Sequence, residues 1–176
     1  QIIDSYAVVD IEHAPQNFDV GGFVGLNRDR GIIINAYSAG TVTESSSRNS
    51  HDFVGRSTGA LTRTFGATSS NPYAQSTYGT KTGGVWTGFD FDNTWFMIDG
   101  QTRPMLRMEH STTITTANQL QLMALAPDQD YRLANGIDLT AALGRDKGLW
   151  RAGFMPVGDT ANGTVFTGSL DGASNT

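Results

Sequence analysis

Residues 21–42 read Gly-Gly-Phe-Val-Gly-Leu-Asn-Arg-Asp-Arg-Gly-Ile-Ile-Ile-Asn-Ala-Tyr-Ser-Ala-Gly-Thr-Val. Two short apolar runs, 23–24 and 32–34, lie on either side of a polar segment at 27–31. Glycines bracket both runs. Short apolar runs bounded by glycine and polar residues are typical of strands joined by turns. We therefore expect a strand–turn–strand unit in this stretch.

Parts of this unit recur before and after it. Tyr6, Tyr37 and Phe65 occupy equivalent positions in three similar segments, 31 and 28 residues apart. Val24 and Val54 lie in two Phe-Val-Gly elements, 30 residues apart. A fixed period of this length is typical of stacked repeats, in which each unit buries its apolar face against its neighbour.

The repeat predicts an all-β fold: a right-handed parallel β-helix (β-solenoid) with glycine-rich turns. An antiparallel hairpin array or a sandwich is the alternative, because it also uses short strands and glycine turns. The residues expected to build the repeated framework are Gly22, Val24, Gly25, Ile34, Tyr37, Ile3, Tyr6, Val54 and Phe65.

The second half of the chain changes character. A dense aromatic group at 84–98 follows the last repeat and is expected to cover the end of the stack. One short helix is expected near 116–126, with Thr115 or Thr116 as its N-cap and Pro127 as its stop. We expect two regions: 1–108, the end of a repeat array with its aromatic closing segment, and 109–176, the start of a following β-solenoid module.

Composition excludes several classes of protein. The chain has 176 residues, a net charge of −5 and no cluster of Lys and Arg, which disfavours nucleic acid as a partner. It has no cysteine, so disulfides, thiolate metal sites and a cysteine nucleophile are excluded. No apolar run approaches the roughly 18 residues that span a membrane. Because Gln1 stands where Met would begin a gene product, we expect a processed product or a segment of a longer protein.

The repeat resembles the GLUG repeat of bacterial surface proteins. Residues 22–27, Gly-Phe-Val-Gly-Leu-Asn, and 34–42, Ile-Asn-Ala-Tyr-Ser-Ala-Gly-Thr-Val, are similar to its two elements. Residues 94–107 are similar to the segment that closes such an array, and 114–139, 153–158 and 166–172 to the module that usually precedes one. The second repeat departs from the pattern, because Arg56-Ser57 replaces the expected Leu-Asn.

The resemblance implies an exported protein, such as a filamentous-haemagglutinin-like adhesin, with an extracellular or cell-surface location. Its implied function is structural and adhesive. The implied partners are other copies stacked head to tail, neighbouring modules of the same protein, or host and surface glycans.

Residues capable of chemistry are few. His13, His51 and His110 lie beside polar residues and lack the His-Glu-x-x-His spacing of zinc peptidases. A carboxylate-rich stretch could hold Ca²⁺ through hard oxygen ligands, although turn capping is the favoured explanation. That stretch contains Asp90, Asp92, Asn93 and Asp99. We expect no catalytic, cofactor-binding or metal-binding residue, and no cofactor.

Two alternatives to the structural function stay open at the level of sequence. Trp86 and Trp95 could form an aromatic platform for sugars, which would make the chain a carbohydrate-binding module. Asp90 and Asp92 could serve a polysaccharide-active enzyme, since paired carboxylates cleave glycosidic bonds.

Overall fold

A computed structural model gives the structure of residues 1–14, 18–44, 49–66, 78–140, 142–143, 148–158 and 164–173. The chain forms two compact units, Gln1–Phe89 and Asp90–Thr176. The boundary expected near residue 108 therefore lies inside the second unit. The assignment of the two regions to a repeat array and a following module stays a prediction.

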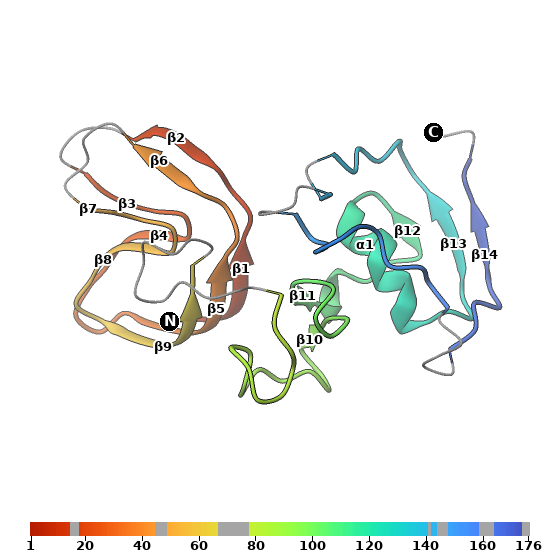
Figure 1. Cartoon of the computed structure of the whole chain (residues 1–176), viewed down its shortest axis with the longest axis horizontal. Coiled ribbons are helices and arrows are strands. Elements are labelled where there is room, and N and C mark those ends of the chain that lie inside the picture. Colours follow the sequence, from red (N-terminus) through yellow and green to blue (C-terminus); the bar gives the residue numbers. More distant parts are fainter. Residues whose placement is uncertain are drawn as a thin grey trace. The chain divides into compact units, whose positions relative to one another are not determined.

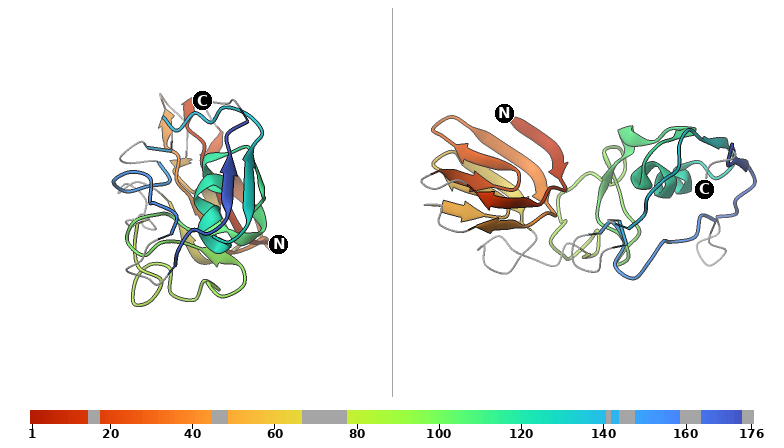
Figure 2. Two further views of the ribbon diagram at one scale, coloured as in Figure 1. Left: turned by 90° about the vertical axis from the view of Figure 1, so that its right-hand side faces the viewer. Right: turned by 90° about the horizontal axis from the view of Figure 1, so that it is seen from above.

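The first unit is built from short parallel strands (Figures 1 and 2). Strands β1, β5 and β9 form a three-stranded sheet, and β2–β6, β3–β7 and β4–β8 form three pairs. The right-hand view of Figure 2 shows these strands in successive layers, from red through orange to yellow. The strands are β1 (Ile2–Ala7), β2 (Ile11–Ala14), β3 (Asp19–Gly21), β4 (Val24–Asn27), β5 (Ile32–Ser38), β6 (Val42–Glu44), β7 (Asn49–His51), β8 (Val54–Ser57) and β9 (Ala60–Phe65).

The register of these pairs follows the spacing in the sequence. Tyr6 pairs with Tyr37, and Tyr37 pairs with Phe65. Val24 pairs with Val54. The residues that the repeat aligns are therefore direct neighbours on adjacent strands.

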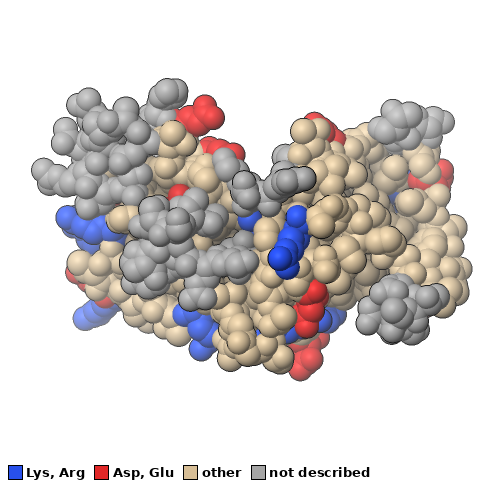
Figure 3. Space-filling model, in the orientation of Figure 1, with Lys and Arg blue, Asp and Glu red and all other residues tan. Residues whose placement is uncertain are grey.

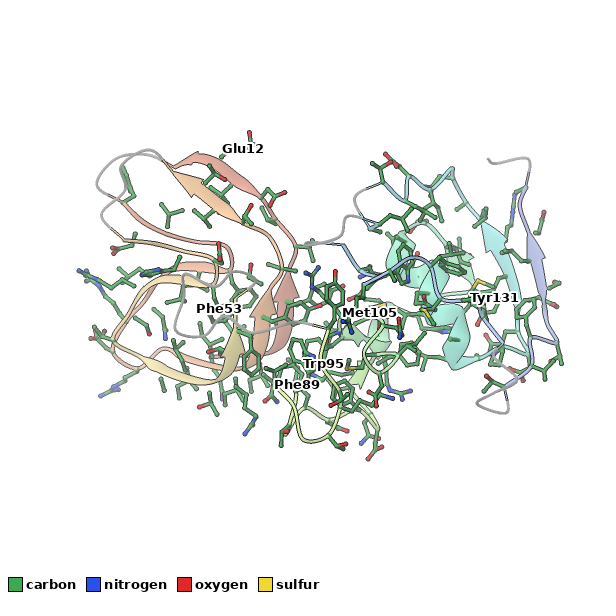
Figure 4. The ribbon with its side chains drawn as sticks, in the orientation of Figure 1. Glu12, Phe53, Phe89, Trp95, Met105 and Tyr131 are labelled. Carbon is green, nitrogen blue, oxygen red and sulfur yellow. The ribbon has the colours of Figure 1, made fainter. Side chains whose placement is uncertain are left out.

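The core of the first unit lies between these strands. Ile33, Ala36, Phe53 and Val54 are buried together. Phe53 points into the space that the strands enclose (Figure 4). Full burial of one such large side chain contributes about 1.5–3 kcal/mol. The unit thus has a small apolar core shared by consecutive layers.

The second unit combines three kinds of element. Strands β10 (Trp95–Phe96) and β11 (Met105–Leu106) pair antiparallel, and β12 (Thr113–Ile114), β13 (Asp130–Leu133) and β14 (Ser169–Asp171) form a parallel sheet. Helix α1 (Ala117–Leu122) is flanked by the 3₁₀ helices η1 (Arg107–Glu109) and η2 (Met123–Leu125). The expected helix and N-cap are confirmed, because the Thr116 side chain accepts a hydrogen bond from the Gln119 backbone N–H. The core here contains Ile114, Met123 and Tyr131.

The right-handed parallel β-helix predicted for the chain is wrong. The described strands are divided among small sheets of two or three strands, parallel and antiparallel, with one short α-helix, and they do not close into a solenoid. The physical reason lies in the spacing of the pairs. In the second unit β12 and β13 pair with an offset of 19 residues, as in Thr113 with Arg132, and β13 and β14 with an offset of 39, as in Asp130 with Ser169. Without a constant period, successive layers cannot continue one stack.

Candidate functional site

The main candidate site is the sheet β1–β5–β9, where equivalent residues of three strands line up in columns. The first column is polar. Asn35 donates from Nδ2 to Asp4 Oδ1 at 2.9 Å and accepts at Oδ1 from Arg63 Nε at 2.6 Å. A chain of hydrogen bonds therefore runs from Arg63 through Asn35 to Asp4. We call these three residues the polar column.

The polar column marks a bend in every strand. Asp4, Asn35 and Arg63 have φ values of 46°, 50° and 49°. This left-handed conformation is costly for most residues and is tolerated best by Gly, Asn and Asp. The three strands thus bend at the same point, and the side chains at the bend bond to one another. The grouping of these three residues could have been predicted from the sequence, because an alignment of the three repeats places them at the same position.

The second column is aromatic and lies two residues further along each strand. The rings of Tyr6 and Tyr37 stack with centroids 5.2 Å apart and planes 7° apart. Phe65 continues the column on β9 by pairing with Tyr37. Rings in stacked or edge contact contribute about 0.5–1.5 kcal/mol beyond the area they bury. We call Tyr6, Tyr37 and Phe65 the aromatic column.

Trp86 and Phe89 cover the β9 end of the aromatic column. Trp86 contacts Phe65 edge-on at a centroid distance of 5.3 Å, and it contacts Tyr37 at 5.2 Å. Phe89 lies 6.2 Å from Phe65 and 5.1 Å from Trp86. A Cβ added at Gly88, between them, would lie 2.8 Å from Arg63 Cδ. Segment 84–89 therefore covers the β9 end of the aromatic column, whereas the rest of the predicted closing segment, 90–98, belongs to the second unit.

The β1 side of the same sheet is an edge. Among the described residues β1 pairs only with β5, and no described strand lies beyond it. Ile2 and Ile3 are 37% and 45% exposed, and Val8 and Val9, just after the strand, are 56% and 51% exposed. Aliphatic side chains at a strand edge are unusual, because such edges invite pairing with another strand.

The remaining residues expected to build the framework lie in the neighbouring sheets and at one turn. Val24 is half-buried against Val54, which is buried. Gly22 is buried, and a Cβ there would lie 2.4 Å from the Asp52 carbonyl oxygen. A Cβ on Gly25 would lie 2.7 Å from the Asp19 carbonyl oxygen.

Ile3 and Ile34 pair across β1 and β5, but the main buried aliphatic residue of β5 is Ile33. The bend at Asn35 explains the difference. It interrupts the alternation of side chains, so that Ile33 is buried before the bend and Ala36 and Tyr37 are both buried after it.

The two tryptophans proposed as a sugar platform are both fully buried, with 0% exposure. Trp86 belongs to the first unit and Trp95 to the second. A sugar needs an open ring face to stack on, and neither indole offers one. Their role in the structure is packing, which weakens the argument for a carbohydrate-binding module built on them.

The acidic stretch is a local turn. Asp90 accepts hydrogen bonds from the backbone N–H groups of Asp92 and Asn93, at 3.1 and 3.0 Å, and from the Asn93 side chain. The hydrogen bond from the Asn93 backbone, followed by that from its side chain, lowers the pKa of Asp90. A carboxylate committed to its own turn is typical of capping. In the described residues, no group of three or more His, Cys, Asp or Glu is placed to hold a metal ion.

The histidines are in different surroundings. His51 is exposed at the end of β7, and the side chain of His13 lies outside the described residues. His110 Nε2 lies 2.9 Å from Tyr131 Oη. Tyr131 Oη also lies 2.8 Å from the Ala126 carbonyl oxygen, which can only accept. The single hydroxyl proton is therefore given to Ala126, and His110 is the donor to Tyr131.

The second unit contains a buried polar network. Gln121 is fully buried and accepts at Oε1 from Trp150 Nε1 at 2.5 Å and from the Met155 backbone N–H at 3.3 Å. Its Nε2 donates to the Met155 carbonyl oxygen at 3.2 Å. Both ends of the amide are thus satisfied. A fully bonded core amide of this kind fixes packing and is not a reactive group.

Charge is spread over the surface. Basic residues lie at several separate places on the face shown in Figure 3, with uncharged residues between them. No helix in the described part of the chain has the length and apolar character needed to cross a membrane.

Comparisons of this chain with protein-family models, with curated proteins and with solved structures find no match. The resemblance to GLUG-repeat proteins therefore stays a prediction.

Proposed function

We propose that the chain is a structural and adhesive segment of an extracellular bacterial surface protein, with neighbouring modules or other copies as its partners. One observation carries the proposal: equivalent residues of β1, β5 and β9 bond and stack on one another in register. In this sheet the polar and aromatic side chains are used to join strand to strand. That is the chemistry of a scaffold, since each layer is stabilised mainly by its neighbours.

The candidate reactive groups support the same proposal. Asp90 is engaged in its own turn, and His110 donates to Tyr131, whose hydroxyl is bonded to a carbonyl. An activated nucleophile needs a neighbouring base, and a glycosidase needs two carboxylates facing one sugar. Neither arrangement occurs among the residues discussed above. We therefore assign the chain no reaction.

The location is tested on intact cells of the source organism. A protease is added to whole cells, and the released peptides are identified by mass spectrometry. Peptides of this chain are expected before lysis. Their appearance only after lysis would overturn the extracellular location.

The adhesive role is tested with a deletion strain and its complemented control. Attachment to abiotic surfaces and to glycan-coated surfaces is expected to fall on deletion and to return on complementation. Unchanged attachment of the deletion strain would contradict the adhesive part of the proposal while leaving the location intact.

A further inference from the structure

The segment that follows β13 contains an asparagine directly before a glycine, Asn135-Gly136. Both residues are exposed, as is Ala134 before them. The Ala134 backbone N–H donates to the Ile114 carbonyl oxygen at 3.0 Å, whereas that of Gly136 has no hydrogen-bond acceptor within the described residues. Glycine has no side chain to shield its own nitrogen. An open and unbonded backbone nitrogen therefore comes directly after an asparagine.

The Asn135 side chain is folded back onto its own backbone. Its Nδ2 donates to the Gly136 carbonyl oxygen at 2.7 Å and to the carbonyl oxygen of Thr115, the residue after β12, at 3.3 Å. The first bond keeps the side-chain amide beside the residue that carries the open nitrogen. The second bond is long, so it restrains the amide only weakly. The native fold thus holds Asn135 Cγ close to Gly136.

We propose that Asn135 is a site of spontaneous deamidation in the folded protein. The Gly136 nitrogen gives its proton to a solvent base and attacks Asn135 Cγ, so that a bond forms between the two atoms. The bond from Cγ to Nδ2 then breaks, and Nδ2 takes one proton from solvent and leaves as ammonia. The product is a succinimide ring that joins the two residues. Asparagine is among the residues prone to chemical loss of this kind.

Water completes the reaction. It adds to one of the two carbonyl carbons of the ring, and the bond from that carbon to the ring nitrogen breaks. Opening at Cγ gives aspartate, and opening at the backbone carbonyl carbon gives isoaspartate, whose main chain runs through Cβ and Cγ. In total, one asparagine and one water give one aspartyl residue and one ammonia. Because the segment is exposed, solvent supplies the water.

Deamidation removes a contact between the segments that follow β12 and β13. In the native chain, Nδ2 of Asn135 bonds to Thr115 just beyond the last pair of the two strands. A carboxylate cannot donate, so both carbonyl oxygens that Nδ2 contacts lose their donor. Isoaspartate also lengthens the main chain before Ile137, which packs against the core of the second unit. We therefore expect the hydrogen bond from Ala134 to Ile114 to weaken in the modified chain.

The test uses the full purified chain, kept folded at neutral pH over several weeks. Samples are digested with trypsin and analysed by chromatography and mass spectrometry. The peptide 133–145 is expected to gain the mass that replacement of NH₂ by OH brings, and to separate into an aspartate and an isoaspartate form. The other Asn-Gly pair, 162–163, lies in the peptide 152–176, so the two positions are measured independently. The rate is expected to rise with pH, because the attacking nitrogen has to lose its proton.

Two variants make the test specific. Gly136→Ala places a side chain beside the attacking nitrogen, and its peptide is expected to show none of the product over the same period. Gly136 is not among the glycines in the left-handed conformation, so the backbone accommodates alanine. Asn135→Asp is the aspartate product made directly. Its Ala134 amide is expected to exchange with solvent faster than in the unmodified chain, while the β5 amides of the first unit are expected to keep their protection.

Deamidation of the folded protein is refuted if the peptide 133–145 keeps its mass, or if product forms only in a sample unfolded with urea. Attack by the Gly136 nitrogen is refuted if Gly136→Ala deamidates as fast as the wild type. Equal exchange of the Ala134 amide in Asn135→Asp and in the unmodified chain would contradict the effect on the strand pair. The site goes beyond the structural role proposed above and does not depend on it, because the reaction needs neither a cell surface nor a partner.

Discussion

Asn35 is the residue whose replacement tests the polar column most directly. Asn35→Ala removes two hydrogen bonds, one to Asp4 and one from Arg63. Such bonds contribute about 0.5–1.5 kcal/mol each. Alanine also has to adopt the left-handed conformation, which costs about 1–2 kcal/mol relative to the ordinary helical region. We expect the first unit to lose about 2–5 kcal/mol in total.

Asn35→Gly separates the two contributions. Glycine removes the same hydrogen bonds but adopts the left-handed conformation freely. We expect it to be less destabilising than alanine by about 1 kcal/mol, after allowing for the larger entropy that glycine loses on folding. Asn35→Asp keeps the size and the bend but places a carboxylate beside Asp4. Its effect is expected to shrink at high salt, which screens partly exposed charges.

The assay has to report on the first unit alone, because the chain has two compact units and a single melting temperature would mix them. Native-state hydrogen exchange of the β5 amides meets this need. The matched control is the exchange of the β13 amides in the second unit, which is expected to stay unchanged. If alanine, glycine and aspartate all leave β5 protection at the wild-type level, the polar column does not stabilise the sheet.

Three further predictions concern other parts of the chain. Gly40→Ala is expected to push the end of β5 away from the segment that follows β1, because the added Cβ would lie 1.7 Å from the Val9 carbonyl oxygen. Both segments are then expected to lose protection of their backbone amides from hydrogen exchange. Unchanged protection of both segments would refute this prediction. Burial raises the pKa of Tyr131 above its ordinary value of 10.0. The second unit therefore keeps this contribution to its stability below pH 10 and loses it as the pH rises through the pKa of the folded state. Tyr131→Phe is expected to remove this loss of stability at alkaline pH from unfolding curves followed by circular dichroism. Asn93→Ala is expected to raise the pKa of Asp90 toward its ordinary 3.8 in an NMR titration, and an unchanged pKa would show that the side-chain hydrogen bond is not a cause of the shift.

Where the sequence has a period, it predicts contacts well. The spacing of Tyr6, Tyr37 and Phe65 identifies residues that the structure pairs in register. The helix after Thr116 was also predictable, because an N-cap and a run of helix formers are local signals. Both results depend on information contained within one segment or one repeat.

The strand pairing of the second unit lacks such information. Its parallel sheet joins Thr113 to Arg132 and Asp130 to Ser169, and nothing in the local sequence selects these partners. The sequence favoured packing for the aromatic segment that contains Trp86 and Trp95 but left a ligand-binding role open, because such a segment has the same composition whether it packs inward or binds a ligand. Only the tertiary contacts decide between the two.

A period also specifies less about its own region than it first suggests. It indicates which residues of successive repeats lie side by side, but not how the backbone within one repeat is divided into strands and turns. Between β1 and β9 the path is divided among separate short strand pairs beside the three-stranded sheet. At Gly40 the neighbouring carbonyl of Val9 leaves no room for a side chain, and at Asn35 the strand itself bends. Side chains matched in register can therefore line up across three strands without the sheets joining into a closed solenoid, and this is why the columns were predictable while the predicted β-helix was wrong.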